Sequence, residues 1–134
     1  KECDWSSDVC SSDLTSVPIC TGEDIYLKEN FRPLLKKGGV SVIHPDILTV
    51  GGVLELKKVG DMAEDYGVAM AVHMAETPIS ALAAAHAVAA TQNFLALEFH
   101  SVDVPWWESL VKRSSRPQSG TGIMPMTDAG AEVF

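Results

Sequence analysis

The sequence has few basic residues, few cysteines and no long hydrophobic run. Ten Lys and Arg residues stand against 18 Asp and Glu residues, which gives a formal net charge of -8 at pH 7. This balance argues against binding to nucleic acid or to a membrane surface, because phosphate groups are bound by a basic face. No run of about 18 apolar residues is present, so we expect no transmembrane helix. The first residues lack a basic region followed by an apolar stretch, so we also expect no signal peptide and a cytoplasmic protein.

The first fourteen residues, KECDWSSDVCSSDL, differ in composition from the rest of the chain. They are rich in Ser, Asp and Cys and have neither helical nor strand periodicity. The string VCSSDL is similar to the translation of a common sequencing adapter, so we interpret residues 1–14 as a disordered artefact; a native disordered tail is the alternative. Without this segment Cys20 is the only cysteine that remains, which excludes a disulfide framework and a cysteine-based zinc site.

From residue 17 onward, short apolar segments alternate with segments of helical spacing. The apolar segments contain β-branched residues and are predicted to be buried strands at 17–20, 40–43, 68–72 and 94–97. Their nearly continuous hydrophobicity is typical of parallel strands that are covered on both faces.

The segments between these strands have the periodicity of helices. In the first, around residues 27–35, we expect Pro33 to interrupt and restart the helix. The second places apolar residues on one face and ends near Gly67, which suits a helix C-terminus. Its apolar face is Leu56, Val59, Ala63 and Tyr66. The third is rich in Ala, and Thr77 followed by Pro78 predicts its cap and first turn. Alternating strands and helices predict a parallel sheet and the α/β fold class.

An ionisable residue follows each predicted strand. These residues are Glu23, Asp46, His73 and Glu98. Successive members are separated by 23, 27 and 25 positions, each about the length of one βα unit. Because the C-terminal ends of the strands of a barrel meet at one mouth, we expect the four side chains to form one site. An open, doubly wound sheet would gather ligands mainly at its switch point, so four successive contributions favour a barrel.

Each of the four residues also has a structural explanation when it is taken alone. Glu23 could be an acid favoured by a helix N-terminus, Asp46 a turn or cap residue, and His73 a core histidine. Glu98 closes an apolar run, where a carboxylate must find a partner or stay near solvent. Together they suit metal-assisted acid–base chemistry, in which Asp46 orients His73 and stabilises its charged form.

Three further polar residues have either a structural role or a place in the site. We expect His44 and His86 to be structural. Glu76 follows His73 by three positions, in the loop that leads to the next helix, and is a candidate substrate contact.

Four segments resemble the mandelate racemase subgroup of the enolase superfamily. They are TGED at 21–24, HPD followed by GG at 44–52, AVHMAE at 71–76 and LALEFHSVDVPWW at 95–107. The resemblance runs from about residue 17 to residue 112. It implies the C-terminal part of a TIM-like (β/α)7β barrel, incomplete in this chain, and a Mg²⁺ cofactor that stabilises an ene-diolate.

The resemblance also implies a role for each residue of the predicted site. Glu23 matches the third of three carboxylates that bind Mg²⁺, and Asp46 and His73 match an Asp–His dyad in which His73 is the general base. Glu98 matches the acid that hydrogen-bonds the substrate carboxylate as the enolate develops. An Asp rather than a Lys at position 46 argues against the muconate lactonizing subgroup. The other two metal carboxylates, the Lys motif on the opposite side of the site and the N-terminal capping domain have no counterpart in the sequence.

The resemblance therefore implies a fragment of a Mg²⁺-dependent acid-sugar dehydratase that acts on a small carboxylate and whose parent enzyme is a homo-oligomer. We expect the fragment itself to be inactive. A racemase or epimerase of the same superfamily and a non-catalytic structural α/β fragment are the alternatives. The expected division of the chain is 1–14, a barrel segment at 15–113, and a tail at 114–134 that could be truncated.

Overall fold

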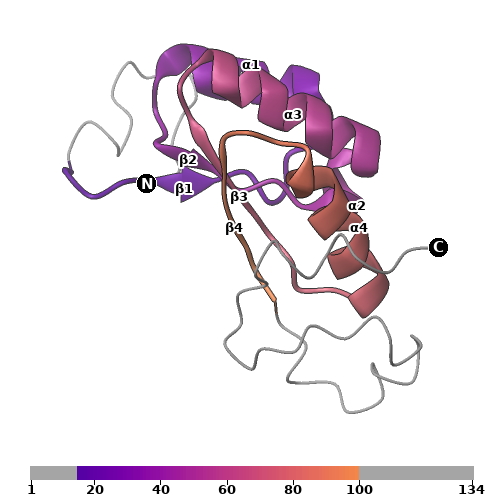
Figure 1. The fold of residues 1–134 in the computed structure, drawn as a ribbon. Coiled ribbons are helices and arrows are strands. Elements are labelled where there is room, and N and C mark those ends of the chain that lie inside the picture. Colours follow the sequence, from indigo (N-terminus) through magenta and orange to yellow (C-terminus); the bar gives the residue numbers. More distant parts are fainter. Residues whose placement is uncertain (1–14, 100–134) are drawn as a thin grey trace.

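A computed structural model of the chain describes residues 15–99. These residues form four strands and four helices (Figure 1). In chain order they are β1 (Cys20–Thr21), α1 (Leu27–Lys37), β2 (Val42–Ile43), α2 (Ile47–Val50), α3 (Val53–Asp65), β3 (Ala69–Val72), α4 (Pro78–Ala89) and β4 (Phe94–Leu97). The predictions for residues 1–14 and 114–134, and for the barrel segment beyond residue 99, lie outside the described residues.

The four strands form one parallel sheet in the order β1-β2-β3-β4. Each strand lies beside the next strand of the sequence, which is the arrangement of successive βα units in a barrel. Strands β2, β3 and β4 fall within the predicted segments, whereas β1 overlaps its segment 17–20 only at Cys20. Both β1 and β2 are two residues long. The prediction that the first strand is buried is wrong, because β1 lies at the edge of the described sheet and its two residues are exposed. The C-terminal ends of the strands lie at the same edge of the sheet because all three pairings are parallel.

The core lies between the sheet and its helices. Along β3, Met70 and Val72 are buried, whereas Ala69 and Ala71 between them are half-buried. The helices of residues 15–99 therefore cover one face of the sheet, and the expectation that both faces are covered is not met within this part of the chain. Figure 1 shows α1 and α3 side by side, and α3 also packs against α4. The largest fully buried side chains of the core are Phe31, Ile43, Ile47, Leu56, Met70 and Met74.

Helix α1 is continuous through Pro33, so the predicted interruption is wrong. A proline inside a helix removes one backbone hydrogen bond and crowds the carbonyl four residues earlier. Tertiary packing of an apolar face stabilises a helix more than its local propensity does, and α1 buries Phe31, Leu34 and Leu35. The helix ends at Gly38, whose φ of 64° places it in the left-handed region that favours glycine.

Helix α2 was not predicted. It has only four residues, too few to show a hydrophobic period. Asp46 caps its N-terminus, and the left-handed Gly51 ends it. The short helix matters for the site because it fixes the orientation of the Asp46 carboxylate.

The predictions for α3 and α4 were closer. Tyr66, predicted on the buried face of α3, is the C-terminal cap residue and is 42% exposed, while Leu56, Val59 and Ala63 of that face are buried. The predicted start of α4 is confirmed, since the hydroxyl of Thr77 accepts a hydrogen bond from the Ser80 N–H and Pro78 is the first helical residue. None of the helices within residues 15–99 has the length and apolar character that crossing a membrane requires.

Candidate active site

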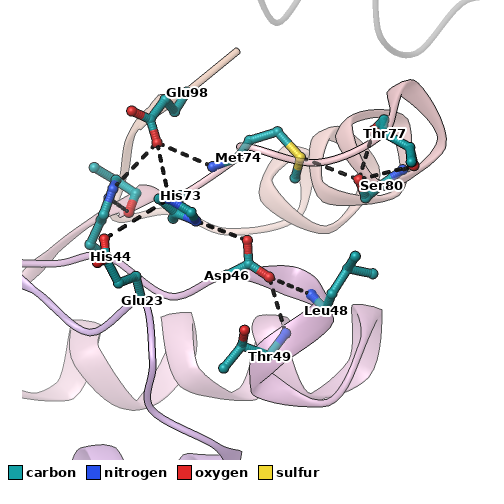
Figure 2. Close-up of polar contacts among 11 residues, drawn as sticks. Glu23, His44, Asp46, Leu48, Thr49, His73, Met74, Thr77, Ser80 and Glu98 are labelled. Atoms are coloured by element: carbon teal, nitrogen blue, oxygen red, sulfur yellow. Dashed lines mark hydrogen bonds and ion pairs between the residues drawn. The ribbon is translucent and has the colours of Figure 1, made fainter. Parts of the chain in front are cut away.

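The structure brings Glu23, Asp46, His73 and Glu98 together at the C-terminal edge of the sheet (Figure 2). His73 lies at the centre of the group. Its Nδ1 is 3.0 Å from Asp46 Oδ2, and its Nε2 is 3.9 Å from Glu23 Oε2 and 3.8 Å from Glu98 Oε2. Four side chains that are far apart in the sequence therefore converge because they follow four neighbouring parallel strands.

The backbone sets the position of Asp46 relative to His73. The two residues form a parallel β-bridge beyond the ends of β2 and β3, and the His73 N–H donates to the carbonyl of Pro45 at 3.1 Å. The side chain of Asp46 is 2% exposed. Its Oδ1 accepts hydrogen bonds from Leu48 N at 2.7 Å and Thr49 N at 3.0 Å, which caps α2. Its Oδ2 is thereby directed at His73, so Asp46 is both a helix cap and the partner of the histidine.

The environment shifts the proton affinities of this pair in opposite directions. Burial alone would raise the pKa of Asp46, but the hydrogen bonds from His73 and from the Thr49 N–H hold that pKa below its ordinary value. Burial alone would lower the pKa of His73, but the hydrogen bond to Asp46 and the charge of Glu98 raise it above its ordinary value. A carboxylate that favours the charged imidazole is the arrangement expected of a histidine base and its partner.

Glu98 is held at the edge of the site by β3. Its N–H donates to the Val72 carbonyl at 3.0 Å, and its Oε2 accepts from the Met74 N–H at 3.2 Å. This contact keeps Oε2 of Glu98 beside His73 (Figure 2), while the side chain is 35% exposed.

Glu76 also lies close to the dyad of Asp46 and His73. Its Oε2 is shielded from solvent and has no hydrogen-bond partner among the described residues. Burial raises the pKa of Glu76, and its contact with the Asp46 carboxyl raises that pKa further. One ligand atom each of Asp46, His73 and Glu76 lies within 4.8 Å of the others, so Glu76 faces the proposed dyad.

His44 belongs to the same cluster, although the sequence interpretation assigned it a structural role. Its ring packs edge-on against that of His73, with centroids 5.2 Å apart, and its Nε2 is 3.6 Å from Glu98 Oε2. A signal was present in the sequence: His44 precedes Asp46 by two positions at the end of a strand, and such residues point to the same side. His86, the other histidine expected to be structural, is exposed on α4.

The residues of the cluster include oxygen ligands suited to a hard cation. The side chain of Glu23 is 57% exposed at the mouth, and carboxylate oxygens are the ligands that Mg²⁺ takes from proteins. Glu23 therefore fits a magnesium ligand, next to a histidine whose Nδ1 is occupied by Asp46. His73 can therefore take up a proton at Nε2, next to the place where Glu23 would hold a cation.

The fold and this constellation of residues define the barrel domain of the enolase superfamily. A family model described as "Enolase C-terminal domain-like" matches residues 6–130 of the chain. The chain therefore belongs to this family, and the similar structures place it among the mandelate racemase-like members.

Three proteins are similar to this chain over more than half of its length. D-xylonate dehydratase of Haloferax volcanii is 42% identical over 111 residues, which cover 83% of this chain and 27% of the relative. D-galactonate dehydratase of Ralstonia pickettii is 40% identical over 72 residues, which cover 54% of this chain and 19% of the relative. A solved structure of a mandelate racemase/muconate lactonizing enzyme-like protein from a Roseovarius species has a TM-score of 0.74 and 34% identity, over 85% of this chain and 28% of that chain.

These similarities confirm the predicted family and the prediction of an α/β barrel segment. The chain spans less than a third of the length of each of these three proteins.

Proposed function

We propose that the full-length protein that contains this chain is a Mg²⁺-dependent acid-sugar dehydratase. Two similar proteins are named dehydratases of D-xylonate and D-galactonate, both of which are sugar acids. The observation that carries the proposal is the contact between His73 Nδ1 and Asp46 Oδ2, at 3.0 Å, which leaves Nε2 facing Glu23 and Glu98.

His73 acts as the general base in this proposal. The Asp46 carboxylate only accepts hydrogen bonds when ionised, so His73 Nδ1 carries a hydrogen and Nε2 holds the lone pair that takes the proton. The proton comes from the carbon beside the substrate carboxylate. Asp46 stabilises the imidazolium that forms, and its own orientation is fixed by the cap of α2.

Glu98 and His73 share the remaining steps. Glu98, held by the Met74 N–H, takes up a proton when the substrate binds and donates it in a hydrogen bond to the substrate carboxylate as negative charge develops there. The hydroxyl group on the next carbon then leaves as water, with the proton returned by His73. The enol that remains becomes a 2-keto-3-deoxy acid, so one molecule of water is lost for each molecule of sugar acid.

Glu23 is the proposed magnesium ligand from this chain. When bound, Mg²⁺ supplies positive charge that stabilises the negative charge developing on the substrate carboxylate. Glu76 is the proposed contact to a substrate hydroxyl, because its buried Oε2 has no partner among the described residues.

Replacement of the base tests the proposal. In the full-length protein, His73→Asn should lower turnover of D-xylonate and D-galactonate by about a hundred- to ten-thousand-fold or more, since Asn keeps much of the shape but cannot take the proton. Magnesium affinity and the thermal melting temperature should be retained. His86→Asn is the matched control, because His86 is exposed on α4, and it should retain turnover. Near-normal turnover in His73→Asn would show that the base is assigned wrongly.

The product separates the dehydratase from its runner-up, a racemase or epimerase. Both begin with the same proton abstraction, but an epimerase returns the proton to the opposite face and keeps the hydroxyl group. A 2-keto-3-deoxy product detected by mass, 18 Da lighter than the substrate as loss of one water requires, supports the dehydratase; a stereoisomer of unchanged mass supports the epimerase.

Several features of the proposal remain predictions. They are the cytoplasmic location, the homo-oligomeric state of the full-length protein, the lack of nucleic-acid and membrane partners, the inactivity of the fragment, and the division at residues 14 and 113. Activity and sedimentation of the full-length protein beside the isolated segment test the inactivity and the oligomeric state.

A further inference from the structure

His44 has one ring nitrogen committed to the backbone. Its Nδ1 is 2.9 Å from the carbonyl oxygen of Ala71. A carbonyl oxygen only accepts hydrogen bonds, so Nδ1 carries the hydrogen, and in the neutral ring Nε2 holds the lone pair. The ring is anchored at the neighbouring strand and directs Nε2 towards the site.

The neutral ring of His73 is in the same tautomer as that of His44. Asp46 Oδ2 accepts from its Nδ1 at 3.0 Å, so the lone pair of the neutral ring is again on Nε2. Both Nε2 atoms face the same place, since they lie 3.6 Å and 3.8 Å from the same oxygen, Oε2 of Glu98. These separations exceed those of hydrogen bonds.

Glu23 supplies a third ligand atom for a metal ion, next to the two histidines. One ligand atom each of Glu23, His44 and His73 lies within 4.8 Å of the others. The exposed side chain of Glu23 can move towards the two rings without disturbing the core. The two histidines are already oriented by a carboxylate and a carbonyl, the partners that fix the tautomer of metal-binding histidines.

We propose that His44, His73 and Glu23 form a binding site for a borderline divalent cation such as Zn²⁺, distinct in its ligand chemistry from the magnesium site. Imidazole nitrogens bind zinc at about 2.0–2.1 Å and carboxylate oxygens at similar distances, whereas Mg²⁺ takes oxygen ligands in octahedral geometry. Two nitrogen donors on one ion therefore select for zinc over magnesium. The carboxylate of Glu98 beside both rings adds a negative charge that favours the cation.

The binding of zinc here has a consequence for catalysis that rests on the proposed function. Zinc bound to His73 Nε2 occupies the lone pair that takes the substrate proton, and it draws Glu23 away from magnesium. Zinc is therefore an inhibitor that competes with magnesium rather than a substitute for it.

Calorimetry with zinc chloride on the full-length, metal-free protein tests the site without any measurement of turnover. His44→Gln should weaken zinc binding by about tenfold or more. The same variant should leave magnesium affinity unchanged, and His86→Gln, which alters an exposed histidine, should change neither affinity. Equal losses of zinc and magnesium affinity in His44→Gln, or no loss of zinc affinity, would overturn the proposal.

A measurement on the unmodified protein guards against a variant that fails to fold. X-ray absorption spectroscopy of the zinc-loaded protein should show two imidazole ligands at about 2.0 Å. One imidazole or none would contradict the site. The outcome is separate from the proposed dehydratase activity, because a protein that does not turn over sugar acids can still bind zinc through these residues.

Discussion

Asp46 holds His73 with one carboxylate oxygen and caps α2 with the other. Oδ2 accepts from the imidazole at 3.0 Å, while Oδ1 accepts from the N–H groups of Leu48 and Thr49 in α2. The predicted cap is therefore confirmed, and the same carboxylate also contacts His73, whose role as a catalytic base stays a prediction.

The two contacts of Asp46 can be separated by substitution. Asp46→Asn keeps an oxygen for the cap but presents an amide N–H to the hydrogen of His73 Nδ1, so it disfavours the required tautomer. Asp46→Ala removes both contacts and should cost about 1 kcal/mol more in free energy of unfolding than Asp46→Asn. Both variants of the full-length protein should lose about a hundred-fold or more in turnover. Urea denaturation and steady-state kinetics check the pair. An Asn variant as active as the wild type would mean that the carboxylate does not orient the base.

Glu23→Gln should weaken magnesium binding by about tenfold or more, because a neutral amide replaces an anionic ligand. Asp24→Asn is the matched control: it removes the same charge from the adjacent exposed residue and should leave the affinity near that of the wild type. Calorimetry with magnesium chloride measures both. Equal losses in the two variants would indicate a general effect of charge and not coordination by Glu23.

Glu76→Gln should stabilise the full-length protein relative to the wild type, and this stabilisation should be larger at neutral pH than at acid pH. The pKa of Glu76 is raised in the folded state, so folding favours its protonated form. The stability of the wild type is then fully present below the ordinary pKa of 4.5 and falls as pH rises from that value to the folded pKa. Gln does not titrate, so the difference in unfolding free energy between variant and wild type should grow as pH rises above the ordinary pKa of 4.5. A difference that is constant across this range would contradict the raised pKa.

The same position tests the proposed substrate contact. Glu76→Ala removes the buried oxygen and should raise KM for the sugar acid more than it lowers kcat, as expected for a residue that binds the substrate. A change in kcat alone would assign Glu76 to the support of Asp46 instead.

Gly60→Ala should destabilise the protein by about 1–3 kcal/mol, although Ala is the better helix former. An added Cβ at this position of α3 would lie 2.6 Å from Thr91 Cγ2 and 3.3 Å from Met70 Cε. Thr91→Ser removes that methyl group and keeps the hydroxyl that donates to the Ala87 carbonyl. The double variant should therefore recover part of the loss. A double variant no more stable than Gly60→Ala would show that the methyl contact is not the cause.

The sequence predicted the parts of the fold that depend on periodicity. The strands and the start of α4 follow from apolar runs and from Thr77-Pro78, and the spacing of the ionisable residues predicted that they would converge. The continuity of α1 through Pro33 could not be predicted, because the burial of Phe31, Leu34 and Leu35 depends on contacts with distant parts of the chain. Helix α2 was missed because four residues carry no period.

The candidate site was predicted less completely than the fold. His44 was expected to be structural. Its contacts with Ala71 and Glu98 come from strands that are distant in sequence, so they do not follow from the residues around it. Burial of Glu76 Oε2 is likewise a property of the packed loop, which no local pattern reports.

The β-bridge between Asp46 and His73 makes the separation of these side chains a matter of strand register. The segment between β2 and β3 can change in length while the two strands stay paired in the same register. The Asp46–His73 contact is then preserved, because the backbone pairing places the two residues opposite each other. A slip of β3 by a single residue would do the opposite: it would turn His73 to the other side of the sheet and bring Val72 or Met74 into its place. An insertion in the turn at residues 66–67, which follows α3 and leaves its buried face in place, should therefore be tolerated far better than a shift of one position within 69–73.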